Sequence, residues 1–547
     1  MLAQILARRN RLVLLLIVLL GAALRFFLIG TKTIWLDEAF SIWIARHSLW
    51  EGWRWLVKID QHPPLYYSLL SLWQALFGDA QGVVRAFSAL CSTATLPFMY
   101  LAAKRVTRDE ITALLATLIL AVAPFHVRFA QETRMYALLT LLAAMALYCA
   151  ALYLGGYGTR RLTWRDWVTP VRWRRLHDVR AAVGLALAQA GVMLTHNTAA
   201  VFFPLALNVA VLGALAYQRS TGRYVSLRAV NSPRFGRNWA MIQGVAFLLW
   251  LPWAVPFVLQ ARLVDGEFWI QAPTLRTIAG TLKTFSFAHL PDWLPAVPFL
   301  VLYALLALAG LFYFRKRMAW ALLLLSLCVV PFVGELLVSL RRPIFYDRTL
   351  IWTTLPFYLL MAIGIRGVMV GAFGPGKEER FPARAELSTH PGEMRARQVI
   401  AGLAVAVILS LSGVSLFNYY TAFQKEEWAT AAAYVAERAE PGDMLVFNAT
   451  WVQLPFAYYF RHYDTATELH GAPVDLFDRG VLEPKMTEAD VPHLRALVAD
   501  ADRVWLVYSH EWYTDPDGII QRELGTLMQQ TDRESFEGLQ VLTFARP

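Results

Sequence analysis

The sequence is poor in cysteine and in charge. Only three of its 547 residues are cysteines, and Lys, Arg, Asp and Glu together make up 17%. Soluble domains carry about 25% charged residues, and small secreted scaffolds depend on many cysteines. Cys91, Cys149 and Cys328 lie within or beside apolar runs, at spacings that match no metal or redox motif. The composition therefore excludes a soluble enzyme and a disulfide scaffold, and we expect buried free cysteines.

The sequence also lacks a phosphate-binding loop. The stretch GPGKEER at 374–380 does not have the spacing of a P-loop, and GGYG at 155–158 follows an apolar run rather than a strand. Chemistry that depends on a bound nucleotide or dinucleotide is therefore not expected.

Apolar residues, in contrast, make up 57% of the chain. Runs long enough to cross about 30 Å of hydrocarbon fill the first 417 residues, whereas residues 419–547 resemble an ordinary water-soluble domain. The first run follows basic residues as a signal peptide does, but its length of about 19 residues favours an uncleaved span. The predicted fold class is an α-helical polytopic membrane protein of about eleven transmembrane helices with a C-terminal soluble α/β domain. The predicted spans are 12–30, 83–103, 110–127, 134–154, 181–197, 199–217, 239–258, 295–314, 319–338, 349–370 and 399–417.

Charge is divided unevenly along the chain. Residues 1–417 hold 41 Lys and Arg against 19 Asp and Glu, and residues 418–547 hold 10 against 21. With the N-terminus in the cytoplasm, the inner segments carry 26 basic residues and the outer loops about 12, as the positive-inside rule requires. The basic excess thus has a membrane explanation, and no nucleic acid is expected as a partner. The odd number of spans then places the acidic tail outside the cytoplasmic membrane. The inner segments are 1–11, 104–109, 155–180, 218–238, 315–318 and 371–398.

The stretch 63–78, PPLYYSLLSLWQALFG, is apolar but short. Counting this stretch as a span would reverse the orientation of all later spans and move a strongly basic loop to the outside. We predict a helix that lies in the outer interface, with its Trp and Tyr side chains at headgroup depth.

Unusual polar residues gather in the predicted outer loops. In the first of them, residues 31–82, Asp37 and Glu38 are adjacent within TIWLDEAFS. An acidic pair on an apolar interfacial segment is costly unless it has a partner or a function. The spans and their orientation follow from apolar length and loop charge alone. That all these polar clusters fall on the outer side is therefore an independent observation. The other candidates are His62 in DQHPPLYY, Glu132, Arg134 and Tyr136 in HVRFAQETRMYAL, His196 beside Thr195 and Asn197, and Arg341, Arg342, Tyr346 and Arg348 in RRPIFYDRTLIW.

Structural roles compete with functional ones at most of these positions. Glu132 and Arg134 could pair at a helix end, and His196 could cap a helix. Arg341 and Arg342 could be anchors at the membrane surface, and Arg348 could form a local ion pair with Asp347. The acidic pair is the hardest to explain as structure alone.

One mechanism accounts for the whole set. Carboxylates beside basic groups at the outer mouth of a membrane cavity suit a reaction on a lipid-linked phosphate. Arg and His would neutralise the phosphate as it leaves, and a carboxylate would take a proton from an attacking hydroxyl. A transporter or flippase for a lipid-linked or anionic substrate is the main alternative, although such proteins place coupling charges near the bilayer midplane. A scaffold protein whose tail binds partners would leave the acidic pair unexplained.

Four segments resemble a known family. TIWLDEAFS, HPPLYY, QETRMYALLTLL and RxxxFYDRTLIWTTLPFY, in this order and on one side of the membrane over about 400 residues, resemble the GT-C glycosyltransferases, in particular bacterial relatives of protein O-mannosyltransferases and aminoarabinose transferases. The resemblance implies a multi-span transferase that takes a sugar from a polyprenyl-phosphate carrier outside the cytoplasmic membrane. The acceptor can be a lipid, a glycan or a protein, and membrane lipids are further partners.

The resemblance also implies roles for the candidate residues. Asp37 corresponds to the general base, with Glu38 as the alternative or a partner that positions the acceptor. Glu132 and Arg134 would shape the site. Arg348 matches the residue that contacts the lipid phosphate, but the usual Arg-Tyr order appears here as Tyr346, Asp347, Arg348, so Arg341 and Arg342 remain candidates. His62 and His196 would bind phosphate or a metal. Tyr136 completes the substrate-binding candidates. The sequence requires no cofactor and leaves a divalent metal open.

The tail alternates helical and strand patterns. The pattern predicts helices over 426–439, 452–461, 488–501 and 517–530, and strands over 443–449, 503–509 and the final residues from 542. This alternation indicates a small α/β domain with a mainly parallel sheet. We therefore divide the chain into a transmembrane catalytic domain, residues 1–418, and an extracytoplasmic domain, residues 419–547.

Overall fold

The eleven apolar runs all fall on helices of the computed structural model, which describes residues 2–156, 161–169, 176–263, 270–370, 391–463, 467–475 and 485–547. Parts of the predicted inner segments 155–180 and 371–398, and the stretches 155–158 and 374–380, lie wholly or partly outside the described residues. The helices that carry the runs are α1 (Leu2–Phe26), α5 (Gln81–Thr107), α6 (Glu110–Val122), α8 (Tyr136–Leu154), α11 (His177–Met193), α12 (Asn197–Thr221), α13 (Phe235–Trp250), α16 (Ala296–Phe314), α17 (Met318–Ser339), α18 (Thr354–Val370) and α19 (Pro391–Thr421).

Several of these helices are long and apolar enough to cross a bilayer. By length and composition, seven helical stretches of the described residues qualify, or eight if α6 and α7 (Pro124–Ala130), which meet at a bend of 57°, form one span. One stretch, Ala296–Ser339, holds two predicted spans around the 3-10 turn η3 (Arg315–Arg317). The chain is a multi-pass membrane protein, and the prediction of eleven spans exceeds the seven or eight that length and composition alone support.

Small residues let two central helices approach closely. Helix α16 packs along α18, and each contributes one glycine to the contact. A Cβ on Gly310 would meet the backbone of Leu360, and a Cβ on Gly364 would meet the carbonyl oxygen of Leu306. Close backbone packing of this kind is how membrane helices gain van der Waals contact in a solvent as apolar as themselves.

Replacing Gly364 by valine is expected to destabilise the bundle. The added side chain meets backbone rather than a movable side chain, so the two helices must separate, at a cost of about 1–3 kcal/mol. Thermal unfolding in detergent measures the effect, with Gly413→Val as the matched control, because a Cβ on Gly413 meets nothing within 4 Å. Equal melting temperatures for the two variants would contradict the close contact.

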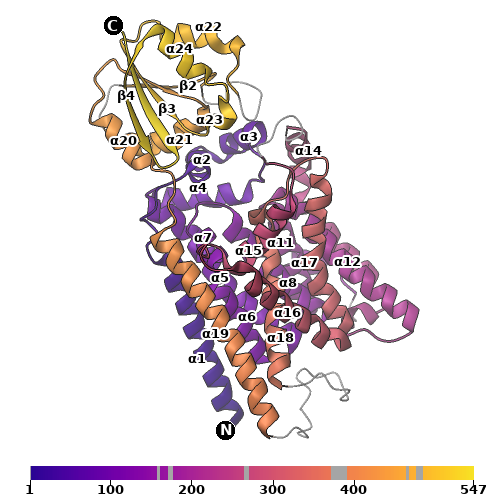
Figure 1. The fold of residues 1–547 in the computed structure, drawn as a ribbon. Coiled ribbons are helices and arrows are strands. Elements are labelled where there is room, and N and C mark those ends of the chain that lie inside the picture. Colours follow the sequence, from indigo (N-terminus) through magenta and orange to yellow (C-terminus); the bar gives the residue numbers. More distant parts are fainter. Residues whose placement is uncertain are drawn as a thin grey trace.

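Short helices form a layer between the bundle and the C-terminal domain (Figure 1). In this layer α2 (Leu36–Arg46) packs on α4 (Leu65–Phe77), and α3 (Leu49–Ile59) begins with a capping box between Ser48 and Glu51. At 13 residues, α4 is too short to span about 30 Å and exposes Leu72 and Leu76, as a helix in the interface would. The remaining helices of the first 370 residues are α9 (Trp164–Val168), α14 (Ala254–Leu263), α15 (Leu275–Phe287), η1 (Arg228–Asn231), η2 (Leu251–Trp253) and η4 (Asp347–Thr353).

The tail folds into an α/β domain around a five-stranded sheet of order β2-β1-β3-β5-β4. The prediction of a mainly parallel sheet is wrong, because β1 pairs in parallel with β2 and β3 whereas β5 pairs antiparallel with β3 and β4. The predicted helix 517–530 ends early and its last residues begin β4. The strands are β1 (Met444–Phe447), β2 (Glu468–Gly471), β3 (Arg503–Tyr508), β4 (Gln529–Phe536) and β5 (Leu539–Ala545), and the helices are α20 (Trp428–Ala436), α21 (Thr450–Phe460), η5 (Glu488–Asp490), α22 (Val491–Leu497), α23 (Glu511–Thr514) and α24 (Ile519–Leu527).

Polar contacts hold this domain against the short-helix layer, where α21 packs on α2. Asp79 accepts from Arg46 at 2.7 Å and from Arg461 at 2.8 Å, so one carboxylate joins both sides. The hydroxyl of Tyr459 accepts from the backbone N–H of Ile34 at 2.6 Å. The C-terminal domain is thereby fixed beside the start of α2, which carries the acidic pair.

Candidate functional site

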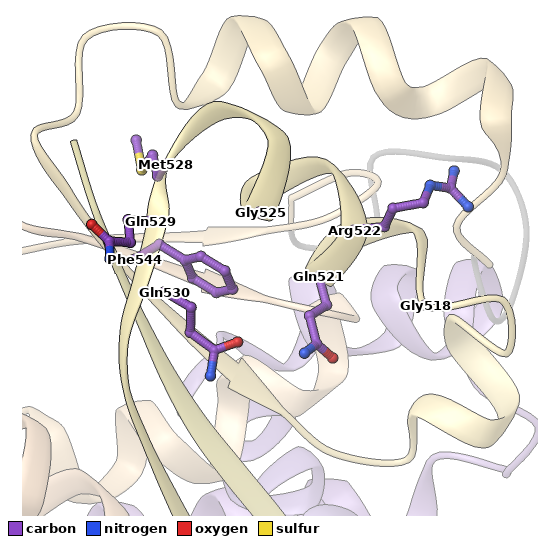
Figure 2. A pocket seen from close by; sticks show the side chains of 8 residues that line it. All are labelled: Gly518, Gln521, Arg522, Gly525, Met528, Gln529, Gln530 and Phe544. Carbon is purple, nitrogen blue, oxygen red and sulfur yellow. The ribbon is translucent and has the colours of Figure 1, made fainter. Parts of the chain in front are cut away.

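Two cavities are candidate sites. One lies in the C-terminal domain (Figure 2), has a volume of about 510 Å³ and contains neither a carboxylate nor a histidine. It offers no group that could act as a general base. Its lining residues are Gly518, Gln521, Arg522, Gly525, Met528, Gln529, Gln530 and Phe544.

The other cavity, of about 620 Å³, lies where the bundle, the short-helix layer and the C-terminal domain meet. It is lined by residues from every cluster that the sequence singled out, although these clusters lie up to 311 residues apart in the chain. The structure brings together eight of the eleven predicted site residues: Asp37, His62, Arg134, Tyr136, His196, Arg342, Tyr346 and Arg348.

Asp37 lies in the first turn of α2 between two guanidinium groups. Arg348 donates from Nη1 to Oδ2 of Asp37 at 3.0 Å, and Nε of Arg134 lies 3.8 Å from the same oxygen. Arg134 also donates to the backbone carbonyl of Asp37 at 3.3 Å and to Ser41 at 3.2 Å, which fixes its position under the helix. The side chain of Asp37 stays 24% exposed, so the carboxylate remains reachable from the cavity.

These neighbours set the protonation of Asp37. Burial by itself raises the pKa of the carboxyl group, but the charges of Arg134 and Arg348 outweigh it and hold the pKa below its ordinary value of 3.8. Asp37 is therefore ionised at neutral pH and can accept a proton.

Arg348 is surrounded by aromatic rings. Its guanidinium carbon lies 4.7 Å from the ring centroid of Tyr346 and 5.8 Å from those of Trp35 and Tyr136. Rings at these distances attract a cation and displace water from it. A planar guanidinium held in this way is suited to a phosphate, which it can contact with two N–H groups.

A second polar wall comes from the loop before α4 and the start of α12. His62 lies 2.9 Å from Asp60, and its ring centroid is 5.3 Å from that of His196. His196 in turn contacts Thr198 at 3.1 Å. Imidazoles here face the same cavity as Asp37 and Arg348 and supply further hydrogen-bonding groups for a polar substrate.

Three predicted residues do not line the cavity. Glu38 is fully buried behind it and accepts from Arg85 at 2.7 and 2.8 Å, from Lys425 at 2.8 Å and from the N–H of Thr133 at 2.8 Å. Glu132, also buried, lies 3.2 Å from Nε of Arg128 and 3.8 Å from Lys425. Arg341 is exposed on the protein surface. The carboxylate of Glu38 thus belongs to a buried ion network.

Glu38→Gln is expected to lower stability by about 3 kcal/mol at neutral pH. Burial raises the pKa of Glu38, but Arg85 and Lys425 bring it down from 4.5 to about 2. Because the folded pKa is lowered, the stabilisation is complete above pH 4.5 and is lost between pH 4.5 and pH 2. Melting temperatures in detergent at pH 7 and pH 3 measure both effects, with the exposed Glu437→Gln as control. A Glu38→Gln variant as stable as this control would contradict the network.

Several residues around the site were not predicted from the sequence. Arg85 lies inside a predicted span, and an arginine in an apolar run could have been singled out, since such residues need a partner. Lys425 lies in the linker between α19 and α20, and nothing in its surroundings marks it. Asp60 lies in the DQHPPLYY segment, but its contact with His62 at 2.9 Å was not predicted. The C-terminal residues that line the cavity, Trp451, His510, Trp512 and Tyr513, were also missed.

Metal ligands are not grouped in the part of the chain that the structure describes. No three His, Cys, Asp or Glu side chains among those residues come together as ligands of one ion. The three cysteines are free, and of them Cys91 is buried whereas Cys149 and Cys328 are half-buried.

Comparisons with known proteins support the fold. A family model described as dolichyl-phosphate-mannose-protein mannosyltransferase matches residues 61–230. No curated protein matches the sequence. Among solved structures, ArnT from Cupriavidus metallidurans in the apo state aligns over 97% of both chains, with a TM-score of 0.58 and 14% identity. The same protein bound to undecaprenyl phosphate gives a TM-score of 0.59 at 13% identity, again over 97% of both chains. The chain has the GT-C fold.

The GT-C fold extends over nearly the full chain, including the C-terminal domain. The archaeal oligosaccharyltransferase AglB from Archaeoglobus fulgidus, in complex with an inhibitory peptide and a dolichol-phosphate, aligns with 97% of this chain and 74% of its own, with a TM-score of 0.57 and 12% identity.

The segment that the family model matches contains His62, Glu132, Arg134, Tyr136 and His196 but neither Asp37 nor Arg348. Asp37 and Arg348, which lie 3.0 Å apart, are therefore both outside the segment that the family model matches.

Proposed function

We propose that this chain is a membrane glycosyltransferase that moves a sugar from a polyprenyl-phosphate donor to an acceptor hydroxyl on the outer face of the cytoplasmic membrane. The observation that carries the proposal is the ionised Asp37 held 3.0 Å from Arg348 at the wall of a cavity. The similar ArnT and AglB structures hold undecaprenyl phosphate and dolichol-phosphate, respectively, which supports a lipid phosphate as the ligand of this fold.

The proposed reaction is a single displacement. The acceptor oxygen forms a bond to the anomeric carbon of the donor sugar while the bond from that carbon to the phosphate oxygen breaks. The electron pair leaves with the polyprenyl phosphate, and the hydroxyl proton passes to Asp37. Arg348 faces the phosphate and stabilises the negative charge that develops on it. Attack from the side opposite the phosphate inverts the configuration of the sugar.

Binding of the donor would also activate Asp37. In the free protein Arg348 donates to the carboxylate of Asp37 and keeps its pKa low. A phosphate that takes over this guanidinium removes one of the two cations beside Asp37. The carboxylate then becomes a stronger base at the moment when the donor is in place, and Arg134 still donates to the backbone carbonyl of Asp37.

The remaining residues take supporting roles in this proposal. Arg342 and Tyr346 line the cavity near Arg348 and extend the phosphate-binding wall. His62, His196 and Tyr136 offer hydrogen bonds and ring faces to the sugars. Glu38 and Glu132 act as positioning residues, since their ion network fixes the start of α2 and the segment before α8.

The two-domain division and the orientation belong to the same proposal. Residues 1–418 would be the catalytic transmembrane domain and residues 419–547 an extracytoplasmic domain, with the N-terminus in the cytoplasm. Loop charge supports this orientation, since the segments rich in Lys and Arg are expected in the cytoplasm, on the side of the membrane opposite to the cavity.

The test is release of sugar from labelled polyprenyl-phosphate sugars by purified protein in detergent. A panel of donors that differ in the sugar is incubated with the wild type and with Asp37→Asn, with and without EDTA, because the sequence leaves a divalent metal open. Release by the wild type alone supports the transferase and identifies the donor. If no donor releases sugar while the protein moves intact lipid-linked sugar across proteoliposomes, the chain is a transporter.

A further inference from the structure

The C-terminal domain contributes a wall of rings to the catalytic cavity. Trp451, at the start of α21, and His510, Trp512 and Tyr513, in and beside α23, line the same cavity as Asp37. The rings of Trp451 and His510 pack against each other, with centroids 5.6 Å apart. Two segments separated by about sixty residues thus present aromatic side chains to one space.

The loop that carries three of these rings is held in place by buried polar contacts. Asn448 donates to the carbonyl of Ser509 at 2.7 Å and to the hydroxyl of Thr514 at 2.8 Å, and accepts from the N–H of Ser509 at 3.0 Å. His510 adopts a left-handed conformation with φ of 54°, which costs energy for a residue with a side chain. Glu426 lies 3.4 Å from its ring. The loop is therefore fixed before any ligand arrives.

Trp512 remains exposed to solvent despite this support. Its exposed fraction is 62%, although a tryptophan side chain gains free energy by leaving water. An indole held at the wall of a cavity is available to a ligand, and its flat face suits a flat apolar partner.

The charges in the cavity are segregated. The membrane domain supplies Asp37, Asp60, Asp347 and the arginines, whereas the four C-terminal lining residues include no carboxylate, lysine or arginine. Ring faces of this kind match a neutral ring that has an apolar C–H face and carries hydroxyl groups on its rim. The C–H face of a pyranose stacks on indole, and its hydroxyls hydrogen-bond to polar tips.

We propose that this wall, Trp451, His510, Trp512 and Tyr513, binds a neutral pyranose of the acceptor. The site deepens the proposed function and rests on it, because the acceptor hydroxyl must reach Asp37 in the same cavity. The pyranose can belong to a free glycan or to the headgroup of a glycolipid. Arg348 holds the donor phosphate on the membrane side, and the wall holds the acceptor on the opposite side.

The experiment uses the full chain in phosphatidylcholine nanodiscs, so that no sugar-based detergent competes. Saturation-transfer NMR is recorded with free trisaccharides of glucose, mannose and N-acetylglucosamine, and in a second arm with alkyl glycosides of the same sugars inserted in the nanodiscs. The variants are Trp512→Ala, Trp512→Phe and the control Trp293→Ala, whose side chain is 77% exposed and lies outside the cavity lining.

The expected result is transfer to the ring C–H protons of at least one sugar, reduced at least threefold by Trp512→Ala, largely kept by Trp512→Phe and unchanged by Trp293→Ala. A signal with the alkyl glycosides alone identifies a glycolipid headgroup as the source. No transfer above empty nanodiscs in both arms, or equal transfer in wild type and Trp512→Ala, overturns the proposal.

Sugar release from the labelled donor without acceptor separates this site from the donor site. Trp512→Ala is expected to lower saturation transfer more than it lowers release. An equal loss of release and of saturation transfer would place Trp512 on the donor side and overturn the proposal. Failure of the proposed function gives a different pattern, in which the wild type releases no sugar from any donor and still shows saturation transfer.

Discussion

Asp37→Asn is expected to abolish sugar transfer while leaving the protein folded and inserted. The amide keeps the shape of the side chain and can still accept a hydrogen bond from Arg348, but it cannot take the proton from the acceptor hydroxyl. Loss of a general base costs about 10²–10⁴-fold in rate. Turnover of the labelled donor in the presence of acceptor measures the effect. In the free protein the pKa of Asp37 lies below 3.8, so kcat/KM for the donor should not fall through this group above about pH 5.

The control for this variant is Asp292→Asn, which removes an exposed carboxylate outside the cavity lining. It should turn over as the wild type does. Size-exclusion chromatography and thermal unfolding show whether each variant is folded. Normal turnover of a folded Asp37→Asn would remove Asp37 from the role of base and leave the cavity without its proposed proton acceptor.

Arg348→Ala is expected to weaken donor binding about 10–100-fold, with a smaller effect on the acceptor. A hydrogen bond to a charged group is worth about 1.5–3 kcal/mol, and this guanidinium is the proposed partner of the phosphate. The KM for the donor measures the loss directly. The variant also removes one cation beside Asp37, so the pKa of Asp37 should rise and the acid limb of the pH profile should move to higher pH.

Arg341→Ala is the matched control, since Arg341 is exposed and does not line the cavity. Its donor KM should equal that of the wild type. Arg342→Ala, which alters a lining residue, should give an intermediate effect. If Arg348→Ala leaves the donor KM unchanged and Arg342→Ala raises it, the phosphate contact moves to Arg342.

The sequence was sufficient to predict the helical membrane architecture, because length and apolarity determine which runs fold as helices in lipid. It also predicted which loops supply the polar residues of the cavity. The residue pattern alone did not distinguish the members of the acidic pair, and only the family resemblance placed Asp37 before Glu38. Asp37 and Glu38 are adjacent in α2 and so point about 100° apart, but which of them faces the cavity depends on where Arg85 and Lys425 pack.

The C-terminal domain was harder to predict for two physical reasons. Strand β4 is an exposed edge strand with the sequence QQTDRESF, so it shows no alternation of apolar residues, and the antiparallel pairing at this edge stayed hidden. The contribution of Trp451 and Trp512 to the cavity depends on how the domain docks on α2. Contacts between distant segments leave no local pattern in the sequence.

A structure of the protein with a non-hydrolysable polyprenyl-phosphonate sugar would test the proposed function most directly. We expect the phosphonate to contact the guanidinium of Arg348, Arg348 to have left Asp37, and the anomeric carbon to face the carboxylate of Asp37 across the space left for the acceptor. A phosphonate bound away from Arg348, with the ion pair between Arg348 and Asp37 intact, would contradict it.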